Sequence, residues 1–358
     1  NALTDSMQRV DMMMIDDIGA TSVRFAHYQQ ADIIYSLCDS LGILAWAEIP
    51  FVNASSGKEG PNAKQQLTEL IKQNYNHPSI FTWGLHNEVY TKYPSGYPAR
   101  LTHELNDLAK VLDPYRPTVS TSGYGTMDRN MNRKADIQAM NRYFGWYYGD
   151  LQDLDTWIDG LKENYPEYNV VLSEYGAGAN IHQHTEDVRK PKNVISGQFF
   201  PEEYQTQYHV YYWSVIEAHP YLLSSYVWNM FDFCVPGGWN RGGVMDRNLK
   251  GLITFDRQTK KDAFFWYKAN WSEHPVLHIA GRRFKNRTKR ENRIEVFSNL
   301  ENLELSLNGK DQGAFSKGAN ECDLIWNLKL KKGENRLKAT GTKNGKTYTD
   351  TIVLYYKK

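Results

Sequence analysis

Cysteine is scarce in this sequence, with three examples, Cys38, Cys234 and Cys322, among 358 residues. They lie far apart in the chain and are odd in number. They therefore indicate neither the paired framework of a disulfide-bonded domain nor the close ligand spacing of a zinc site. Cys38 falls within a helical pattern, where cysteine acts as a small core residue. Cysteine usage leaves the redox compartment open.

Long hydrophobic runs and an excess of one charge are also absent. No apolar run approaches the roughly 18 residues of a membrane helix, so we predict no membrane partner. The 42 basic and 41 acidic residues give a net charge of +1 and are mixed along the chain. Without a basic face to hold phosphates, nucleic acid is not an expected partner. The glycine pairs at 237–238 and 242–243 do not lead from a strand into a helix, so no phosphate-binding loop is predicted.

Helical and strand patterns alternate from Leu3 to about Trp271. The first helix begins after the cap Thr4 and ends at Gly19, and further helices are expected at residues 32–41, 63–75, 99–112, 151–164, 204–218 and 262–269. Strands are expected at residues 21–25, 43–49, 80–85, 118–122, 137–140, 170–173 and 222–228. This alternation implies parallel strands joined by crossover helices, so we predict an α/β fold of the (β/α)8 TIM-barrel type.

The strand count leaves this barrel one strand short. A closed barrel has eight strands, and the repeat here opens on a helix, so we expect the first strand to precede Asn1. The chain begins without Met and shows no signal peptide, which suggests a fragment or a processed chain. We expect a periplasmic or secreted location rather than a cytoplasmic one, and we leave a homo-oligomer open.

The sequence changes character after the barrel pattern. Short strand patterns follow one another, with turn signals at Asn308-Gly309, Lys332-Gly333 and Asn344-Gly345. We therefore divide the chain into a catalytic barrel at residues 1–272 and an all-β Ig-like sandwich at residues 273–358. Basic residues gather between positions 282 and 293. We interpret them as a solvated face, with binding of a polyanion as the alternative.

Two glutamates carry the chemical argument. Glu88 follows the apolar run that starts at Ile80, and Glu174 follows the run that starts at Val170. Side chains at the ends of different barrel strands converge over one face of the barrel. Glycoside hydrolysis requires two carboxyl groups across one bond, about 5–5.5 Å apart in retaining enzymes and further apart in inverting ones. The pattern therefore predicts a glycosidase that acts on a carbohydrate substrate.

Several blocks of the sequence, in the same order, resemble family-2 glycoside hydrolases. They lie at residues 24–28 (RFAHY), 37–42 (LCDSLG), 83–88 (WGLHNE), 141–143 (NRY), 172–176 (LSEYG) and 226–232 (YVWNMFD). The stretch from Gly251 to Trp271 resembles the end of that family's barrel. The resemblance covers the whole α/β part and is strongest to bacterial β-galactosidases of the shorter type.

The resemblance implies a retaining mechanism with a covalent glycosyl-enzyme. By its motifs, Glu88 is the general acid/base and Glu174 is the nucleophile. Asn87 donates to the sugar 2-hydroxyl, although a strand-end turn residue is the alternative. Arg24 holds the nucleophile by a charge-assisted hydrogen bond, although a structural ion pair is the alternative.

The same resemblance assigns three aromatic side chains. Tyr143 hydrogen-bonds the nucleophile, and Trp228 forms the floor under the sugar, although each also fits a core residue. His27 has a direct role or is a structural barrel histidine. The larger β-galactosidases have acidic and His metal ligands after the third strand. Residues 51–55 (FVNAS) supply none here, so we predict no magnesium and no cofactor.

We interpret the protein as a retaining exo-β-galactosidase. Asn248 and Lys250 motivate an alternative, because an Asn-x-Lys arrangement in this loop resembles the pair with which β-glucuronidases hold a sugar carboxylate, and a lysine suits an acid group. A surface lysine is the other interpretation of Lys250. A further alternative is an inactive or carbohydrate-binding fragment, because the family's upstream domains are missing from this chain.

Overall fold

The computed structural model describes residues 3–90, 96–123 and 125–357, and the chain forms two compact units. Unit 1 comprises Asn1–Arg142, Asp155–Tyr175 and His219–Val227. Unit 2 comprises Tyr143–Leu154, Gly176–Ala218 and Trp228–Lys358. Each unit is described by itself.

Unit 1 is built on a nearly closed parallel sheet of the TIM-barrel type, which confirms the predicted fold. Its strands pair in the order β1-β2-β4-β5-β6-β7-β8, and the short β3 pairs with β4. They are β1 (Ser22–Phe25), β2 (Leu44–Glu48), β3 (Val52–Ala54), β4 (Ile80–Tyr90), β5 (Thr118–Ser122), β6 (Ile137–Asn141), β7 (Val170–Tyr175) and β8 (Ser224–Val227). Among the described residues, β1 and β8 are the two ends of this pairing order.

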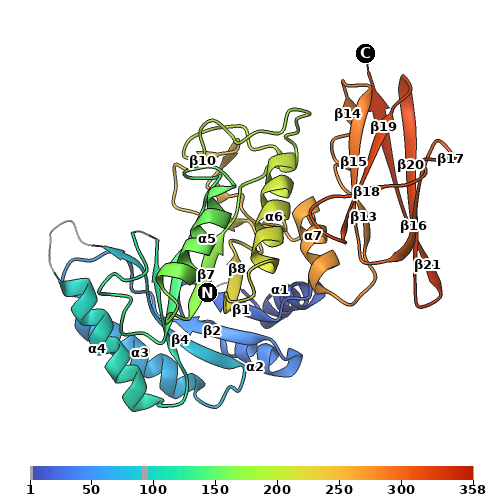
Figure 1. Ribbon diagram of the computed structural model, residues 1–358. Coiled ribbons are helices and arrows are strands. Elements are labelled where there is room, and N and C mark those ends of the chain that lie inside the picture. The colour runs from blue at the N-terminus through green and yellow to red at the C-terminus, as the bar shows by residue number, and fades with distance from the viewer. Residues whose placement is uncertain (1–2, 91–95, 124, 358) are drawn as a thin grey trace. The chain divides into compact units, whose positions relative to one another are not determined.

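Helices follow the strands as the alternation predicts. They are α1 (Asp5–Asp17), α2 (Asp32–Leu41), α3 (Gly60–Asn74), α4 (Tyr97–Leu112) and α5 (Asp153–Asn164). The Oγ of Thr4 accepts a hydrogen bond from the amide of Met7 at 3.3 Å, and α2 ends at Gly42, whose φ of 71° suits glycine. Helices α3 and α4 lie side by side and pack on β2, β4 and β5 (Figure 1).

Two barrel strands are longer than the apolar pattern predicts. Strand β4 continues past Leu85 to Tyr90, and β7 continues past Ser173 to Tyr175. Strand β3 pairs with the extension of β4, which keeps its backbone hydrogen-bonded after the apolar side chains end. Glu88 and Glu174 therefore lie within the last residues of their strands rather than after them.

Unit 2 contains two helices and several small sheets. The helices are α6 (Glu202–Glu217) and α7 (Asp262–Trp271), and β9 (Phe233–Cys234) pairs with β12 (Arg247–Asn248), as β10 (Asn240–Arg241) does with β11 (Val244–Met245). In the C-terminal region one sheet has the order β13-β15-β19-β18 and the other β14-β21-β20-β16-β17. Their strands are β13 (Leu277–Ile279), β14 (Asn286–Arg287), β15 (Glu291–Ser298), β16 (Glu301–Leu307), β17 (Lys310–Asp311), β18 (Ser316–Lys317), β19 (Asp323–Lys329), β20 (Gly333–Lys343) and β21 (Lys346–Tyr356).

The two C-terminal sheets share an apolar core. The alternating burial along β15, β19 and β20 places every second side chain inward, as expected for sheets that face each other. Ile294, Trp326, Leu337 and Leu354 are members of this core. Antiparallel pairing dominates, with the short β14 parallel to β21 as an exception. The predicted C-terminal all-β part is therefore confirmed.

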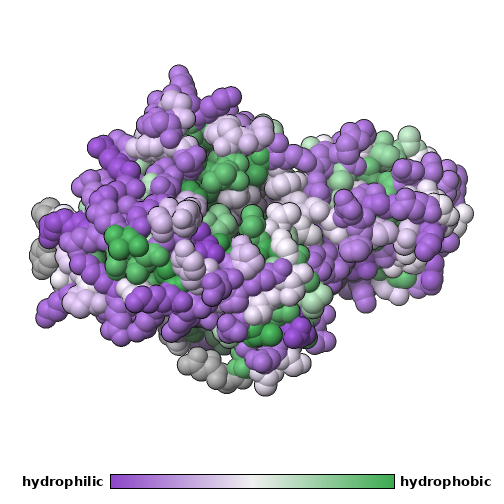
Figure 2. Space-filling view, turned by 90° about the horizontal axis from the view of Figure 1, so that it is seen from below, coloured by the Kyte–Doolittle hydropathy of each residue, from purple (hydrophilic) through white to green (hydrophobic). Residues whose placement is uncertain are grey.

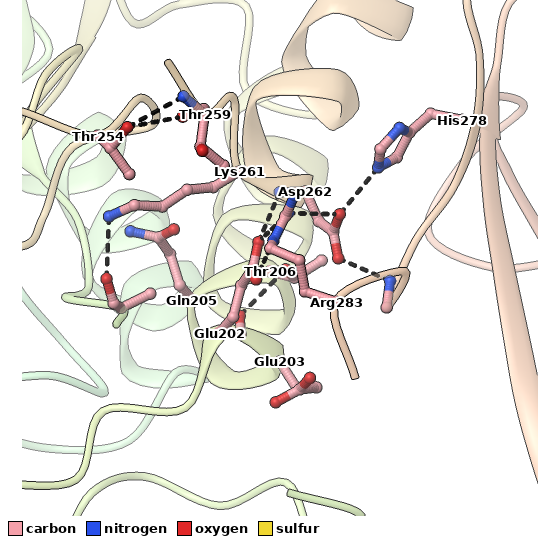
Figure 3. Close-up of polar contacts among 12 residues, drawn as sticks. Glu202, Glu203, Gln205, Thr206, Thr254, Thr259, Lys261, Asp262, His278 and Arg283 are labelled. Carbon is pink, nitrogen blue, oxygen red and sulfur yellow. Dashed lines mark hydrogen bonds and ion pairs between the residues drawn. The ribbon is translucent and has the colours of Figure 1, made fainter. Parts of the chain in front are cut away.

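A buried polar network lies within unit 2 (Figure 3). The Asp262 carboxylate accepts hydrogen bonds from His278 Nε2 at 2.8 Å, Arg283 Nη2 at 3.0 Å and the Gly281 amide at 2.6 Å. Arg283 Nε also donates to Glu202 Oε2 at 2.7 Å. The solvated face expected for the basic stretch is thus wrong for Arg283 and also for Arg287, which is buried. Removing one partner of such a buried pair costs about 3–5 kcal/mol, because it leaves the other charge uncompensated.

We predict that the stability of the protein depends on pH through the carboxyl group of Glu295. It lies diagonally across from Asp323 on the neighbouring strand, because Glu295 faces Ile325 in the register of β15 and β19. Burial and the Asp323 charge raise the pKa of Glu295 from 4.5 to about 7. The unfolded chain loses this proton at a lower pH than the folded chain does. The free energy of unfolding therefore falls as pH rises from about 4.5 through 7 and then levels off.

We expect Glu295→Gln to flatten this part of the pH profile. The measurement is the melting temperature of both proteins between pH 4.5 and 8. Glu291→Gln is the control, because Glu291 is exposed on the same strand. Parallel profiles of the parent and Glu295→Gln would contradict the assignment.

Polar side chains cover most of the surface drawn in Figure 2, and hydrophobic residues reach it in separate patches. None of the helices in the described part of the chain has the length and apolar character needed to cross a bilayer.

Candidate active site

Unit 1 gathers polar side chains at the carboxyl ends of its parallel strands, the face where TIM-barrel active sites lie. They come from β1, β2, β4, β6 and β7 and from the turn after β1. They are Arg24, His27, Glu48, Asn87, Glu88, Asn141, Ser173 and Glu174.

Arg24 is the centre of this group. Its guanidinium donates to Glu174 Oε1 at 2.9 Å, to Asn87 Oδ1 at 2.9 Å, and to both carboxylate oxygens of Glu48 at 2.9 and 3.0 Å. The guanidinium also lies 4.7 Å from the centre of the Trp46 ring. The two acids raise the pKa of Arg24 further, against the effect of its burial, so its charge is fixed. Arg24 therefore orients Glu174 and places a fixed positive charge against it.

Glu88 lies in a different environment. Its Oε1 accepts a hydrogen bond from Asn141 Nδ2 at 2.8 Å, and Ser173 Oγ donates to Asn141 Oδ1 at 2.7 Å. Burial, followed by the negative charge of Glu174, raises the pKa of Glu88 above its ordinary value of 4.5. Glu88 has a positive φ of 50°, and a Cβ at Gly123 would lie 2.1 Å from Glu88 Oε1. Glycine at position 123 thus makes room for this carboxyl group.

The two carboxyl groups are joined by a continuous path of hydrogen bonds. Asn141 Nδ2 donates to Glu88 Oε1 and also, at 3.2 Å, to Asn87 Oδ1, which accepts from Arg24 as well. Because the Asn87 oxygen has two donors, its NH2 group is assigned as the free donor end of the amide. One acid thus has a guanidinium partner and the other an amide partner, so the two carboxyl groups lie in different environments.

His27 lies close to two acids, Glu48 and Glu174. Its Nδ1 lies 2.7 Å from Glu48 Oε1, and its Nε2 lies 3.9 Å from Glu174 Oε1. A proton on Nδ1 satisfies Glu48 and leaves Nε2 as the second ring nitrogen near Glu174. The side chain is 25% exposed, so His27 is neither fully buried nor a surface residue.

Tyr143 and Trp228 belong to unit 2. Tyr143 is buried and packs edge-on against Tyr147, with the ring centres 5.0 Å apart. Trp228 is half-buried and packs edge-on against Phe233 at 5.8 Å. Their assigned roles at the nucleophile and under the sugar remain predictions.

Asn248 and Lys250, also in unit 2, are both buried. The amide of Lys250 donates to Asn248 Oδ1 at 3.1 Å, and Lys250 Nζ donates to the Tyr147 hydroxyl at 2.6 Å. The same ammonium lies 4.6 Å from the centre of the Tyr147 ring and 5.4 Å from that of Tyr143. The interpretation of Lys250 as a surface lysine is wrong. In the described parts of the chain no carboxylate forms an ion pair with it.

Sequence reasoning missed Glu48, Asn141 and Gly123 as parts of the site. Glu48 carried a usable signal, because it interrupts an otherwise apolar run from Ile43 to Ile49, and a carboxylate there must find a buried partner. Asn141 lay in a quoted block without a role. The sequence around Gly123 carried no signal, because the need for glycine at this position arises from its contact with Glu88 on another strand.

A separate group of potential metal ligands lies elsewhere in unit 1. Asp155, Asp159 and His219 place ligand atoms within 4.8 Å of one another. Both acids are exposed, and His219 Nε2 is already 3.1 Å from Asp159 Oδ1. A surface ion pair explains this geometry.

The chain is similar to known glycosidases. A profile described as glycosyl hydrolases family 2, TIM barrel domain, matches residues 2–274, and a domain of unknown function matches residues 289–349. A β-glucuronidase from Bacteroides fragilis is 40% identical over 372 residues, covering 100% of this chain and 52% of that protein. The chain spans about half the length of the curated relatives it matches.

Solved structures give a similar result. A Bacteroides fragilis protein described provisionally as a β-galactosidase shows a TM-score of 0.95 and 51% identity, covering 99% of this chain and 52% of that one. An FMN-binding β-glucuronidase from Facaelibacterium prausnitzii L2-6 shows a TM-score of 0.92 and 36% identity, covering 100% of this chain and 54% of that one.

Proposed function

Because this chain belongs to glycosyl hydrolase family 2, we propose that it carries the catalytic site of a retaining exo-β-glycosidase whose substrate is a terminal β-glucuronide. The observation that carries the substrate assignment is Lys250, a buried lysine whose ammonium binds the Tyr147 hydroxyl and has no carboxylate partner among the described residues. A glucuronide supplies the missing carboxylate, whereas a galactoside carries no charge.

The two glutamates divide the chemistry. In the first step, a Glu174 oxygen attacks the anomeric carbon while the glycosidic C–O bond breaks and the Glu88 proton moves to the leaving oxygen. In the second step, Glu88 takes a proton from water, the water oxygen attacks the anomeric carbon, and the bond to Glu174 breaks. Arg24 supports the charged form of Glu174, and the raised pKa of Glu88 keeps a proton available.

The remaining residues bind the sugar. We propose that Asn87 donates from its free NH2 group to the 2-hydroxyl, a contact that strengthens in the transition state. Tyr143 and Trp228 bind next to the nucleophile and under the ring, and His27 keeps its place through Glu48. Asn248 and Lys250 bind the sugar carboxylate through a neutral amide and an ammonium.

The comparisons favour the glucuronidase interpretation over the galactosidase expected first. The similar curated proteins include β-glucuronidases from Bacteroides fragilis and from Rattus norvegicus, whose matches cover 100% and 73% of this chain. A β-galactosidase is retained as the second candidate because of the 51% identical Bacteroides fragilis structure. The division into a barrel at residues 1–272 and a sandwich at residues 273–358 remains part of the proposal.

Glu88→Gln tests the acid/base assignment. We expect kcat/KM to fall by on the order of 10³-fold for alkyl glucuronides, which need protonation of the leaving oxygen, and far less for activated aryl glucuronides. In the parent, activity should decline as pH rises through the raised pKa of Glu88, since the protonated form is lost there. Equal losses with both leaving groups, or an unchanged upper limb of the pH profile in Glu88→Gln, would contradict this role.

A panel of p-nitrophenyl β-glucuronide, β-galactoside, β-mannoside and β-glucoside tests the substrate. We expect the glucuronide to give the highest kcat/KM. A preference for the galactoside would support the second candidate, and no turnover of any member would support an inactive or carbohydrate-binding chain.

A further inference from the structure

The hairpin that leads into Asn248 has structural features that the proposed mechanism does not use. It spans residues 233–248, where β9 pairs with β12 and β10 pairs with β11. The amide of Val235 donates to Asp246 O at 3.2 Å, and the Gly238 amide donates to Asp246 Oδ1 at 2.8 Å. Its tip is also fixed from outside, because Asn180 Nδ2 donates to Gly242 O at 2.8 Å.

Two arginines on this hairpin lie over aromatic rings. The Arg241 guanidinium carbon is 3.6 Å from the centre of the Trp239 ring, and that of Arg247 is 3.5 Å from the centre of the Phe255 ring. Both arginines are partly exposed. A guanidinium over a ring can still donate N–H groups from its edge, and these match the two oxygens of a carboxylate or a sulfate.

The charges of these arginines are not neutralised locally. In the described ranges, no carboxylate forms an ion pair with Arg241 or Arg247. Arg247 Nη1 instead donates to the sulfur of Cys234 at 2.5 Å. The positive charge of Arg247 acts to lower the pKa of the buried Asp232, but Asp232 forms its ion pair with Lys261, at 2.9 Å. Asp246 bonds to the hairpin backbone.

The hairpin is continuous with the residues proposed to bind the sugar. Asn248 is the partner of Phe233 in the β9–β12 pair, and the Phe233 ring contacts Trp228 at 5.8 Å. Arg247 directly precedes Asn248. Two exposed apolar side chains add surface on which the faces of sugar rings can lie. One is Met245 on the hairpin. The other is Phe199, which lies close in sequence to Gly197, whose carbonyl accepts a hydrogen bond from the amide of Gly242 at the hairpin tip.

We infer that hairpin 233–248 binds the leaving group of the substrate, and that this leaving group is an anionic sugar bearing a carboxylate or a sulfate. The inference rests on the proposed function, because the orientation of the bound substrate follows from Asn248 and Lys250 holding the terminal glucuronide. The natural substrate class is then an acidic oligosaccharide that ends in β-glucuronate, rather than a glucuronide of a neutral aglycone.

The kinetic test compares three β-glucuronyl disaccharides whose second sugar is neutral, carries a carboxylate, or carries a sulfate. We expect the parent to prefer at least one charged disaccharide over the neutral one by about tenfold to a hundredfold in kcat/KM, and the preference to fall with added salt. Arg241→Ala should remove most of this preference, and Arg241→Lys should restore part of it. The control Arg189→Ala changes an exposed arginine outside the hairpin and should keep the preference.

A binding test does not depend on turnover. Cys234 is exposed on the hairpin, so the rate at which 5,5′-dithiobis(2-nitrobenzoate) modifies it reports occupancy, measured in a Cys322→Ser background. A charged disaccharide should slow this reaction at least threefold in the parent and have no effect in Arg241→Ala. No turnover of p-nitrophenyl β-glucuronide together with protection of Cys234 would overturn the proposed function but support the subsite. Turnover without any preference for charge and without protection would overturn the subsite.

Discussion

Glu174→Gln is expected to lower kcat/KM by on the order of 10⁴-fold or more, for aryl and alkyl glucuronides alike. An amide oxygen is a poor nucleophile, and without a covalent intermediate neither leaving group can depart by the retaining route. The substitution keeps the size of the side chain, and its amide oxygen can still accept the hydrogen bond that Arg24 donates at 2.9 Å. Loss of activity should therefore occur without loss of fold.

The control for this substitution is Glu203→Gln. Glu203 is also a poorly exposed glutamate, and it bonds to His184 at 2.8 Å in unit 2, apart from the proposed chemistry. It should keep kcat/KM within about threefold of the parent, and circular dichroism should show both variants folded. Activity of Glu174→Gln equal to that of the parent would refute the nucleophile assignment.

Lys250→Ala is expected to have the second largest effect, and a selective one. Removing the cation that pairs with a desolvated carboxylate costs about 3–5 kcal/mol, so kcat/KM for the glucuronide should fall by about 10²- to 10³-fold. For p-nitrophenyl β-galactoside, which has no carboxylate, the change should stay within about fivefold. The measurement is the ratio of the two kcat/KM values in the parent and the variant.

Two further variants separate charge from packing. Lys250→Met keeps most of the aliphatic stem against the rings of Tyr143 and Tyr147, so it should show the same selective loss with less effect on stability. Lys260→Ala changes a half-buried lysine that lies over the ring of Phe264 and should leave the ratio unchanged. Equal losses on both substrates in Lys250→Met would favour the galactosidase interpretation.

Much of the fold could be predicted from the sequence. Strands covered on both faces are apolar throughout, and the runs that start at Ile80 and Val170 show this directly. Strand ends were harder to predict. Residues 86–90 are mostly polar or bulky, and their backbone pairs with the short β3 on one side and with β5 on the other. Pairing with strands that are distant in the sequence cannot be predicted from the local hydrophobic pattern.

The site was predictable where chemistry and position coincide. The apolar runs indicate Glu88 and Glu174, and the blocks that resemble a family indicate Arg24, Asn87 and His27. The structure brings these side chains together, and their roles stay predictions. Glu48 was missed because a single carboxylate in an apolar run was attributed to the strand. Yet its ion pair with Arg24 at 2.9 Å makes it a support of the site. Asn141 and Gly123 act through neighbours that only the folded chain brings together.

Substrate specificity was the least predictable property. Few residues separate a glucuronide from a galactoside, and the proposed specificity depends on the ammonium of Lys250 and its surroundings. The sequence shows Lys250, but a lysine in a loop is usually solvated. The contacts of Lys250 with the Tyr147 hydroxyl and two aromatic rings, together with its burial, distinguish it from a surface residue.

Covalent trapping tests the central claim most directly. The related Bacteroides uniformis β-glucuronidase 2 has been solved covalently bound to cyclophellitol-6-carboxylate aziridine. We expect this reagent to add one equivalent to the present protein, with the adduct on Glu174 after peptide mapping by mass spectrometry, and Glu174→Gln to stay unmodified. An adduct on another residue, or none under conditions that trap the related enzyme, would contradict the account.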